Sequence, residues 1–392
     1  MPIRSFRDAD VQGKRVLVRV DFNVPMDGSE IRDDSRIQAA LPTINWLIER
    51  DARVILASHL GRPKGKVDPK FSLAPVSGLL SSLLGQRVEI AADVVGLSAR
   101  AEAERLKPGD VLLLENLRFD PGEEANEAEF AAALAGLADT YINDAFGAAH
   151  RAHASTVGVA ERLPAYAGQL MLREIEALRK LIDRPRAGFL AIIGGAKVTD
   201  KIGVLELLVE KVETLIIGGG MANTFLLEAG KEIGRSLAEP EAAPSATAIR
   251  ESARLHGTAL LLPVDGVVAA EMSHTRTQVV PIDAIPATSA VFDIGPESIR
   301  LFAEAIAKAE TIFWNGPMGV FEHTQFATGT NAIARAVADS DAYSVVGGGD
   351  SVAAIEQAGI AHQISHVSTG GGASLEFIEG RELPGITALE RA

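Results

Sequence analysis

Short runs of β-branched and other apolar residues alternate with longer segments of helical pattern along almost the whole chain. This alternation is typical of βαβ units, in which helices cross over a parallel sheet. No identity repeat of about twenty to fifty residues accompanies it, which argues against a solenoid. A chain of 392 residues is too long for one ordinary core, so the sequence predicts an α/β protein of two domains. The runs are RVLVRVDF, ARVILASHL, DVLLLEN and DTYIND in the first half, and GFLAIIGG, ETLIIGGG, TALLLPVD, TIFWNG and YSVVGGGD in the second.

The segment GQLMLREIEALRKLID separates the two groups of runs. Its apolar residues recur at helical spacing from Leu170 to Leu181, and the Arg-Pro-Arg that follows ends the pattern. We therefore expect a connecting helix over residues 169–185, with one domain at 1–168 and another at 186–373.

Charge and composition exclude several classes of protein. The formal net charge of −14 argues against general binding of nucleic acid or of an anionic membrane. The chain has no cysteine, which excludes disulfides and thiolate chemistry. The segment MPIRSFRDADVQG lacks the apolar core of a signal peptide, and no apolar run approaches the ~18 residues of a membrane span. We expect a cytoplasmic protein.

The positions that follow the apolar runs of the first half are rich in cationic and amide side chains. In open α/β sheets ligands bind at the carboxyl ends of the strands, so these positions are the first candidates for a site. Arginine offers a planar fork of donors that matches phosphate and carboxylate groups. The sequence indicates a site for a small, multiply charged anion, although a lone arginine is more often an ordinary surface residue. The candidates are Asp21, Asn23, His59, Arg62, Arg118, Asn143, Asp144, His150, Arg151 and His153, with Arg36 at an expected helix start capped by Asp34 or Ser35.

The corresponding positions of the second half are glycine bends, which leave main-chain N–H groups open to phosphate. Neither a Walker loop nor the G-x-G-x-x-G dinucleotide fingerprint is present. Tight packing is the alternative for any single bend. The bends are Gly194-Gly195, Gly218 to Gly220, Asn315-Gly316 and Gly347 to Gly349.

Lys197 and Lys201 follow the first glycine bend and stand four residues apart. On a helix their ammonium groups would lie on one face and repel each other, unless an anion lay between them. A solvated, basic helix start is the ordinary alternative.

The sequence offers two candidate metal sites. His59, His150 and His153 have no Glu or Cys at metal-ligand spacing, so zinc is the weaker possibility. Asp350 follows the last glycine bend, where a carboxylate beside phosphate-binding amides can hold Mg²⁺. Capping of the next helix by Asp350 or Ser351 is the alternative.

Assembled in order, these motifs make the chain similar to the phosphoglycerate kinase family from near its first residue to its last. The resemblance implies two doubly wound parallel-sheet domains joined by a helix, with a cleft between them and a tail, residues 374–392, that packs back on the first. It implies a monomeric enzyme of glycolysis and gluconeogenesis that moves a phosphoryl group between 1,3-bisphosphoglycerate with ADP and 3-phosphoglycerate with ATP, using Mg²⁺. The motifs are RVLVRVDFNVP, DDSRI, SHLGRPKG, LLLENLRF, INDAFGAAHRAHAST, IIGGAKVTDKI, IIGGGMANTFL, FWNGPMGVFE, VVGGGDS and STGGGASLEF.

The resemblance also implies where the ligands bind. Asp350 would hold the metal, and Glu322 would bind the ribose hydroxyls. The 3-phosphoglycerate site would comprise Asp21, Phe22, Asn23, Arg36, His59, Leu60, Gly61, Arg62, Arg118 and Arg151. The nucleotide site would comprise Gly194, Gly195, Lys201, Gly218, Gly219, Asn315, Pro317, Glu322, Gly348, Gly349, Asp350 and Ser351. The groups that stabilise the transferred phosphoryl would be Arg36, Lys197, Lys201, Gly371 and Gly372.

The acceptor in such a reaction is a carboxylate, which is ionised at neutral pH because its unperturbed pKa is about 3.5. No general base is needed, and the protein supplies alignment and positive charge. We expect Lys201 to hold the nucleotide phosphates, and Lys197 and Arg36 to follow the transferred group.

Because the two ligand sets belong to different domains, we expect domain closure that excludes water. The expected hinges are Ala167–Gly168, Arg184–Pro185 and Gly370–Ala373. Two other classes share the α/β pattern. A nicotinamide-dependent dehydrogenase would carry the missing dinucleotide fingerprint, and a phosphosugar-binding protein would not need the glycine bends.

Overall fold

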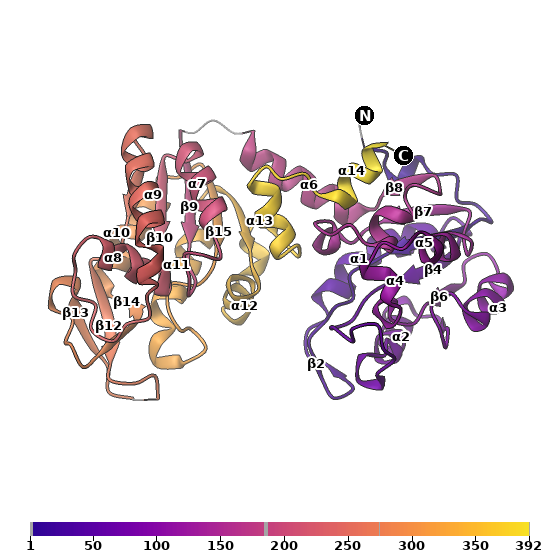
Figure 1. The fold of residues 1–392 in the computed structure, drawn as a ribbon, viewed down its shortest axis with the longest axis horizontal. Helices are drawn as coiled ribbons and strands as arrows, with labels where there is room; N and C mark the ends of the chain where they lie inside the picture. The colour runs from indigo at the N-terminus through magenta and orange to yellow at the C-terminus, as the bar shows by residue number, and fades with distance from the viewer. Residues whose placement is uncertain (1–2, 184–186, 274, 392) are drawn as a thin grey trace. The chain divides into compact units, whose positions relative to one another are not determined.

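The computed structural model describes residues 3–183, 187–273 and 275–391 (Figure 1). Its internal contacts divide the chain into two compact units. The first holds the described residues up to Glu176 together with those from Arg381 onward, and the second runs from Ala177 to Gly380. Each unit contains one six-stranded parallel sheet, which confirms the α/β class predicted from the alternating runs.

The sheet of the first unit has the strand order β5-β6-β4-β1-β7-β8. The chain passes from β1 toward β4 and later returns on the other side of β1 as β7, so the direction of the connections reverses between β1 and β7. Such a reversal opens a crevice for ligands at the carboxyl ends of the strands. The strands are β1 (Arg15–Arg19), β4 (Arg53–Ala57), β5 (Val88–Ile90), β6 (Val111–Leu113), β7 (Thr140–Asn143) and β8 (Ala165–Ala167), with a ribbon of β2 (Met26–Asp27) and β3 (Glu30–Ile31) after β1.

Helices α1 (Ser35–Ile48) and α2 (Ala74–Leu84) contribute to the core against one face of this sheet. Val18 and Leu56 of the strands pack with Ile44 of α1 and Leu80 of α2 in one buried cluster. The last helix, α14 (Pro384–Arg391), packs against β8 and the turn that follows His153 (Figure 1). The remaining helices of the unit are α3 (Leu97–Arg105), α4 (Pro121–Glu124) and α5 (Ala128–Ala135).

The sheet of the second unit has the order β11-β10-β9-β15-β16-β17, in which the connections reverse between β9 and β15. All residues of β9 and β15 are buried, as expected for central strands covered on both faces. The strands are β9 (Phe189–Ile193), β10 (Thr214–Ile217), β11 (Ala259–Leu261), β15 (Thr311–Asn315), β16 (Tyr343–Gly347) and β17 (His366–Val367).

Alternate residues of these strands face the helices. Ile192 and Trp314 pack with Phe302 of α10, Ile333 of α11 and Ile355 of α12 in one buried cluster. Within the described ranges no helix is long and apolar enough to cross a bilayer. The helices of the unit are α7 (Ile202–Lys211), α8 (Gly219–Glu228), α9 (Ala243–His256), α10 (Pro296–Ile306), α11 (Thr328–Ala338), α12 (Gly349–Gln357) and α13 (Gly372–Ile378).

An antiparallel sheet that the sequence analysis did not predict follows β11. Its order is β13-β12-β14, with β12 at Asp265–Ala269, β13 at Gln278–Pro281 and β14 at Ala290–Ile294. Val268 and Val280 of this sheet pack with Leu226 of α8. The sheet therefore lies against the helix that begins at one of the glycine bends.

Helix α6 (Gln169–Ile182) contains the boundary between the two units. Two side chains of the first unit fix its first turn, because Gln169 N donates to Thr43 Oγ1 at 2.9 Å and Met171 N donates to Asp144 Oδ1 at 3.1 Å. Burial raises the pKa of Asp144 to about 6. The hinge predicted at Arg184–Pro185 lies outside the described residues.

Candidate active site

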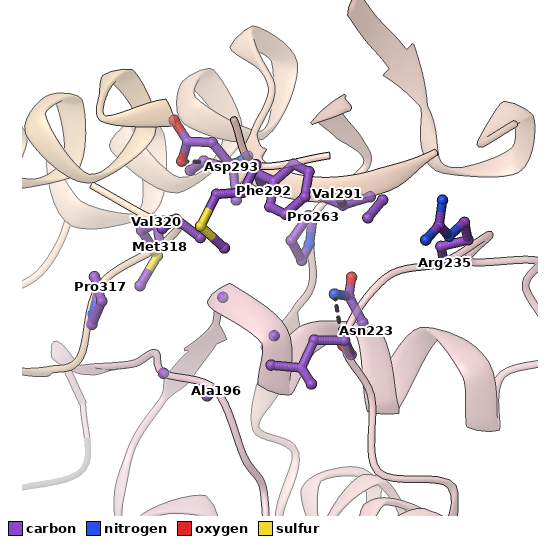
Figure 2. Close-up of a pocket in the computed structure, with 18 of the residues that line it drawn as sticks. Ala196, Asn223, Arg235, Pro263, Val291, Phe292, Asp293, Pro317, Met318 and Val320 are labelled. Carbon is purple, nitrogen blue, oxygen red and sulfur yellow. Dashed lines mark hydrogen bonds between the residues drawn. The ribbon is translucent and has the colours of Figure 1, made fainter. Parts of the chain in front are cut away.

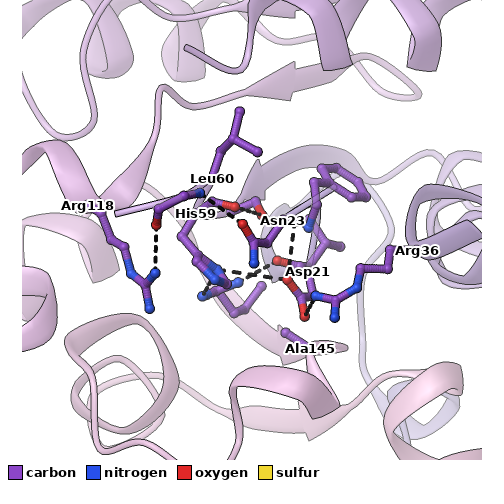
Figure 3. Close-up of polar contacts among 12 residues, drawn as sticks. Asp21, Asn23, Arg36, His59, Leu60, Arg118 and Ala145 are labelled. Atoms are coloured by element: carbon purple, nitrogen blue, oxygen red, sulfur yellow. Dashed lines mark hydrogen bonds and ion pairs between the residues drawn. The ribbon is translucent and has the colours of Figure 1, made fainter. Parts of the chain in front are cut away.

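Polar residues gather where β1 and β4 end in the first unit (Figure 3). Asp21 follows β1, and its Oδ2 accepts a hydrogen bond from Arg36 Nη1 at 2.7 Å. His59 follows β4, and its Nδ1 lies 3.9 Å from Asp21 Oδ1. Asp21 and His59 are buried, whereas the Arg36 side chain is 31% exposed. The ion pair thus fixes a guanidinium at the carboxyl edge of the sheet and leaves part of it open to a ligand.

Behind this pair lies a buried cation that the sequence analysis did not select. Arg19, the last residue of β1, is 1% exposed. Its Nη2 lies 3.1 Å from His59 Nδ1, and its Nε donates to Ser155 Oγ at 2.8 Å. Burial, with the nearby guanidinium groups, holds the pKa of His59 well below its usual range, so the neutral ring accepts from Arg19. A charged residue inside the apolar run RVLVRV was the signal in the sequence.

A fully buried carboxylate balances Arg19 through Ser155. Glu123 Oε1 accepts from Ser155 Oγ at 2.6 Å, and Glu123 Oε2 accepts from Ser155 N at 3.0 Å. His153 Nδ1 lies 3.7 Å from Glu123 Oε1. Burial raises the pKa of Glu123 and lowers that of His153 to about 4. The charges at this edge therefore form one connected network.

The loop after β4 is tied to its neighbours through the main chain of Gly61. Gly61 N donates to Asn23 Oδ1 at 2.8 Å, and Gly61 O accepts from Arg118 Nη1 at 2.7 Å. Leu60 beside it is buried. Gly61 has a φ of +60°, and a Cβ there would lie 2.4 Å from the Phe71 ring, so the turn requires glycine. This turn brings Asn23 and Arg118 to the same edge.

Other predicted residues of the first unit do not join this network. Phe22 is a fully buried core residue. Arg151 Nε donates to His150 Nε2 at 3.0 Å. Arg62 is exposed and makes no hydrogen bond or ion pair within the part of the chain that the structure describes. In that part no group of three or more His, Asp or Glu side chains is placed to hold a metal ion, so the zinc alternative at the histidines has no ligand set.

The helix start before Arg36 has the expected position but not the expected capping hydrogen bond. Asp34 occupies the N-cap position of α1 but makes no capping hydrogen bond, and its carboxylate accepts from Gln38 instead. The Asp33 carboxylate binds the first residue of the helix instead. Its Oδ1 accepts from Ser35 N at 2.8 Å, and its Oδ2 accepts from Ser35 Oγ at 2.9 Å. The backbone of Asp34, with φ −106° and ψ 7°, is not in the extended conformation of a capping residue.

In the second unit three loops meet backbone to backbone at the carboxyl ends of β9, β10 and β15. A Cβ added to Gly194 would lie 2.0 Å from the carbonyl oxygen of Pro317. Gly219 has a φ of +67°, and a Cβ added to it would lie 2.6 Å from the carbonyl oxygen of Gly195. A Cβ added to Gly218 would meet the sulfur of Met318. Packing therefore requires glycine at positions 194, 218 and 219, and Gly219 also lines a cavity together with Gly195.

Lys201 points at the same bends. Its Nζ donates to Gly194 O at 2.8 Å and to Asn315 O at 3.1 Å. Burial lowers the pKa of Lys201 to about 8, against the opposing effect of the Asp350 carboxylate. Asn315 itself is buried, and its Nδ2 has no partner among the described residues.

The expectation that Lys197 and Lys201 stack on one helical face is wrong. Helix α7 begins at Ile202, so both lysines precede it. Glu239 holds the intervening loop, since its carboxylate accepts from Thr199 N at 3.1 Å and from Thr199 Oγ1 at 2.6 Å. Lys197 is exposed on this loop.

Asp350 lies exposed in the first turn of α12 and makes no hydrogen bond within the described ranges. Ser351 is buried, and its Oγ accepts from Gly316 N. Gly348, with a φ of +87°, precedes the helix, and a Cβ there would lie 2.9 Å from Asn315 Nδ2. One unengaged carboxylate fits a Mg²⁺ ion whose other ligands are substrate phosphates and water.

A cavity of about 590 Å³ adjoins the glycine bends (Figure 2). Ala196 and Pro317 lie on one side of it, and Asn223 and Arg235 lie on the other (Figure 2). Glu322 and Asp350 also line the cavity. Its apolar wall was not predicted, because apolar residues in the sequence look the same whether they line a pocket or a core. This wall includes Leu226, Leu237, Pro263, Phe292, Met318 and Val320.

Gly371 and Gly372 stand at the start of α13. Gly371 has a φ of +53°, and a Cβ on either residue would meet open space. Their role toward the phosphoryl group stays a prediction.

A hydrogen-bonded charge cluster on one parallel sheet and a glycine-lined cavity with a free carboxylate on another define an α/β phosphotransferase of two domains. Comparison with known proteins makes the assignment specific: residues 6–381 match the family described as Phosphoglycerate kinase, and the chain belongs to that family.

Relatives of the same name cover almost the entire chain. The chain is 55% identical over 388 residues to the phosphoglycerate kinase of Thermomicrobium roseum, with 99% of each chain covered. It is 56% identical over 386 residues to that of Moorella thermoacetica, with 98% of each covered. A solved structure of phosphoglycerate kinase from Coxiella burnetii matches with a TM-score of 0.90 at 46% identity, covering 100% of this chain and 99% of that one.

The enzyme therefore catalyses reversible, Mg²⁺-dependent phosphoryl transfer between 1,3-bisphosphoglycerate with ADP and 3-phosphoglycerate with ATP.

Proposed function

We propose that the two units divide the substrates, the first binding 3-phosphoglycerate and the second binding the nucleotide. The observation that carries this proposal is the contrast between the sites. A small, multiply charged acid suits guanidinium groups such as Arg36 and Arg118, which match phosphate and carboxylate. A nucleotide needs main-chain N–H groups for its phosphates and an apolar wall for its base, and the cavity beside Gly195 and Gly219 offers both.

The proposed mechanism uses positioned charge and no general base. The 3-phosphoglycerate carboxylate attacks the γ-phosphoryl group in its ionised form, so no proton has to be removed. Lys201 Nζ exchanges the carbonyl oxygens of Gly194 and Asn315 for phosphate oxygens, which are stronger acceptors because they are charged. The Asp350 carboxylate would hold the Mg²⁺ ion, which would neutralise charge on the phosphates.

Arg36 and Lys197 stabilise the charge that spreads over the transferred group, and the N–H groups of Gly371 and Gly372 add to this. The Asp21 carboxylate fixes Arg36 in place for this role. Because these residues belong to both units, we propose that transfer requires domain closure, with hinges at Ala167–Gly168 and Gly370–Ala373.

Small-angle scattering tests closure. The radius of gyration should fall when both 3-phosphoglycerate and a non-hydrolysable ATP analogue are present, and either ligand alone should produce less change. An unchanged radius with both ligands would contradict closure.

Steady-state kinetics with both substrates tests the division of roles. Arg36→Ala should lower kcat by roughly 10²-fold. Arg118→Ala should raise KM for 3-phosphoglycerate only, and Glu322→Gln should raise KM for ATP only. The role of Arg36 would be wrong if its variant kept kcat and changed only KM.

We further propose that the enzyme is a cytoplasmic monomer that binds no nucleic acid. Small-molecule substrates of central metabolism and a net charge of −14 support this. Sedimentation velocity at micromolar concentration should give a single species near the 41.3 kDa of the chain.

A further inference from the structure

A buried carboxylate stands behind the wall of the cavity. Asp293, on β14, is 1% exposed and lies at the cavity beside Phe292 (Figure 2). Its Oδ2 accepts from Gly329 N at 2.6 Å, and its Oδ1 accepts from Ile294 N at 2.9 Å. The first of these bonds reaches across to the start of α11, 36 residues further along the chain.

The segment between β15 and α11, residues 316–329, is folded around this carboxylate. Its Val320 N donates to Phe292 O at 2.8 Å. A Cβ added to Gly319 would lie 2.4 Å from Asp293 Oδ1, and one added to Gly329 would lie 2.3 Å from the same oxygen. Both glycines are therefore required because the carboxylate occupies the space where their side chains would stand.

The same segment forms one wall of the cavity. Met318, Val320 and Glu322 all line it. Glu322 lies between the two points where β14 holds the segment, Val320 is the first of these points, and Met318 stands two residues before it. A shift of the segment by even a fraction of an ångström would change the shape of this wall and the position of the Glu322 carboxylate.

We infer that Asp293 is a positioning residue for nucleotide binding, which holds residues 316–329 so that Met318, Val320 and Glu322 form the wall against the nucleotide. This inference rests on the proposal that the cavity is the nucleotide site. Asp293 acts through the segment and does not touch the phosphates.

The electrostatics of the site agree with such a role. Burial raises the pKa of Asp293 to about 7, while its two backbone hydrogen bonds oppose the rise. The titratable or charged groups that line the same cavity are Glu271, Glu322, Asp350 and Arg235, and none of them bonds to Asp293 within the described ranges. The ionised carboxylate accepts from both N–H groups, and protonation removes one acceptor. The segment is therefore held less firmly as the pH falls through 7.

The matched pair Asp293→Asn and Asp265→Asn tests the inference. Asp265 is also a buried aspartate of the antiparallel sheet, and its carboxylate accepts from Glu297 N at 3.0 Å and from Ser298 N at 2.8 Å, but it does not line the cavity. Loss of a hydrogen bond to a charged group changes an equilibrium roughly tenfold or more. We expect Asp293→Asn to raise KM for ATP about tenfold, with kcat and KM for 3-phosphoglycerate within about twofold. Asp265→Asn should lower Tm without this change in KM.

A second variant disturbs the Asp293 carboxylate through the residue that donates to it. Gly329→Ala should displace the Asp293 side chain and raise KM for ATP as well. In the wild type, KM for ATP should rise as the pH falls from 8 to 6, and the part of this rise that comes from Asp293 should be missing in Asp293→Asn.

Two results would overturn the inference: Asp293→Asn lowering Tm with an unchanged KM for ATP, or Asp265→Asn raising that KM equally. Glu322→Gln separates failure of the inference from failure of the nucleotide-site proposal. If Glu322→Gln raises KM for ATP and Asp293→Asn does not, only the inference fails. If neither raises it, the assignment of the cavity fails too.

Discussion

The candidate sites of the first and second units lie at the same place, the carboxyl edge of a six-stranded parallel sheet, and are built from different chemical groups. In the first unit the site consists of buried side chains, with Arg19 hydrogen-bonded to His59 and linked to Glu123 through Ser155. In the second it consists of main chain, with Gly194 and Gly219 packed against other backbone and a single lysine inserted among the carbonyl groups.

This difference predicts which substitutions each site tolerates. A network of buried charges is stable only while every charge has its partner, so removal of one member leaves another uncompensated. The main-chain groups of the second site carry no formal charge, but an added methyl group there meets carbonyl oxygens that cannot move without moving a strand end. The first unit should be sensitive to changes of charge, and the second to changes of volume.

Glu123→Gln should have the largest effect in the first unit. The substitution leaves the buried Arg19 without the carboxylate that balances it through Ser155. Removal of one partner of a buried pair costs about 3–5 kcal/mol, so we expect the free energy of unfolding of this unit to fall by about 3 kcal/mol. Urea unfolding followed by Trp46 fluorescence in a Trp314→Phe background reports the first unit, because the chain has only two tryptophans.

The double variant with Arg19→Met is the control. If the charges compensate each other, Arg19→Met with Glu123→Gln should cost less than the sum of the two single changes. Strict additivity would show that the two charges are independent, and the comparison between the units would lose its basis.

Among glycine-to-alanine substitutions in the second unit, Gly194→Ala should lower the free energy of unfolding most. The new Cβ would lie 2.0 Å from the Pro317 carbonyl oxygen, and overpacking of this kind costs about 1–3 kcal/mol. We expect a loss of about 2 kcal/mol, measured by unfolding followed by Trp314 in a Trp46→Phe background, together with a raised KM for ATP.

Gly78→Ala in helix α2 of the first unit is its counterpart. A Cβ there would meet nothing within 4 Å, so this change should leave kcat and both KM values unchanged and raise stability by about 0.5–1 kcal/mol. Equal effects of the two glycine substitutions would argue that backbone contact does not define the second site.

The sequence was sufficient for the α/β class, because strand runs such as TIFWN and YSVVG are mostly apolar and end in turn residues. It was not sufficient for the sheet of β12, β13 and β14. The burial of these strands depends on contacts with Leu226, a residue far away in the sequence. Local pattern carries no information on such a contact.

The candidate residues that the sequence revealed are those whose type and position point to a ligand, such as His59 after an apolar run, Arg36 at a helix start and Lys201 after a glycine bend. Arg19 was missed because it lies inside a strand, where an arginine is normally excluded, and its partner Glu123 stands 104 positions away. Asp34 was correctly expected at the N-cap of α1, but the carboxylate that binds Ser35 belongs to Asp33, and the sequence could not show this because the two residues are chemically identical.

The pH dependence of the reaction should distinguish the two sites. Burial lowers the pKa of Lys201 to about 8, so in the enzyme without bound nucleotide this lysine loses its charge above that pH. The profile of kcat/KM for ATP at saturating 3-phosphoglycerate should therefore fall above about pH 8, by up to tenfold per pH unit. The profile for 3-phosphoglycerate at saturating ATP should lack this break, because a bound phosphate keeps Lys201 protonated.

Lys201→Arg is the control, since a guanidinium stays charged across this range. Its lower activity should show no break near pH 8. A break that persists in this variant would belong to another group, and Lys201 would not be the lysine that meets the nucleotide phosphates.

Asn23→Ala should give the smallest effect. The Asn23 side chain accepts one hydrogen bond, from Gly61 N at 2.8 Å, and a typical hydrogen bond contributes about 1 kcal/mol. We expect a stability loss of about 1 kcal/mol and a few-fold rise in KM for 3-phosphoglycerate, because Gly61 also holds Arg118. Asn45→Ala, at an exposed position of α1, should change neither. If Asn23→Ala raised KM for ATP instead, the loop after β4 would not belong to the acid-binding site, and the assignment of one substrate to each sheet would be wrong.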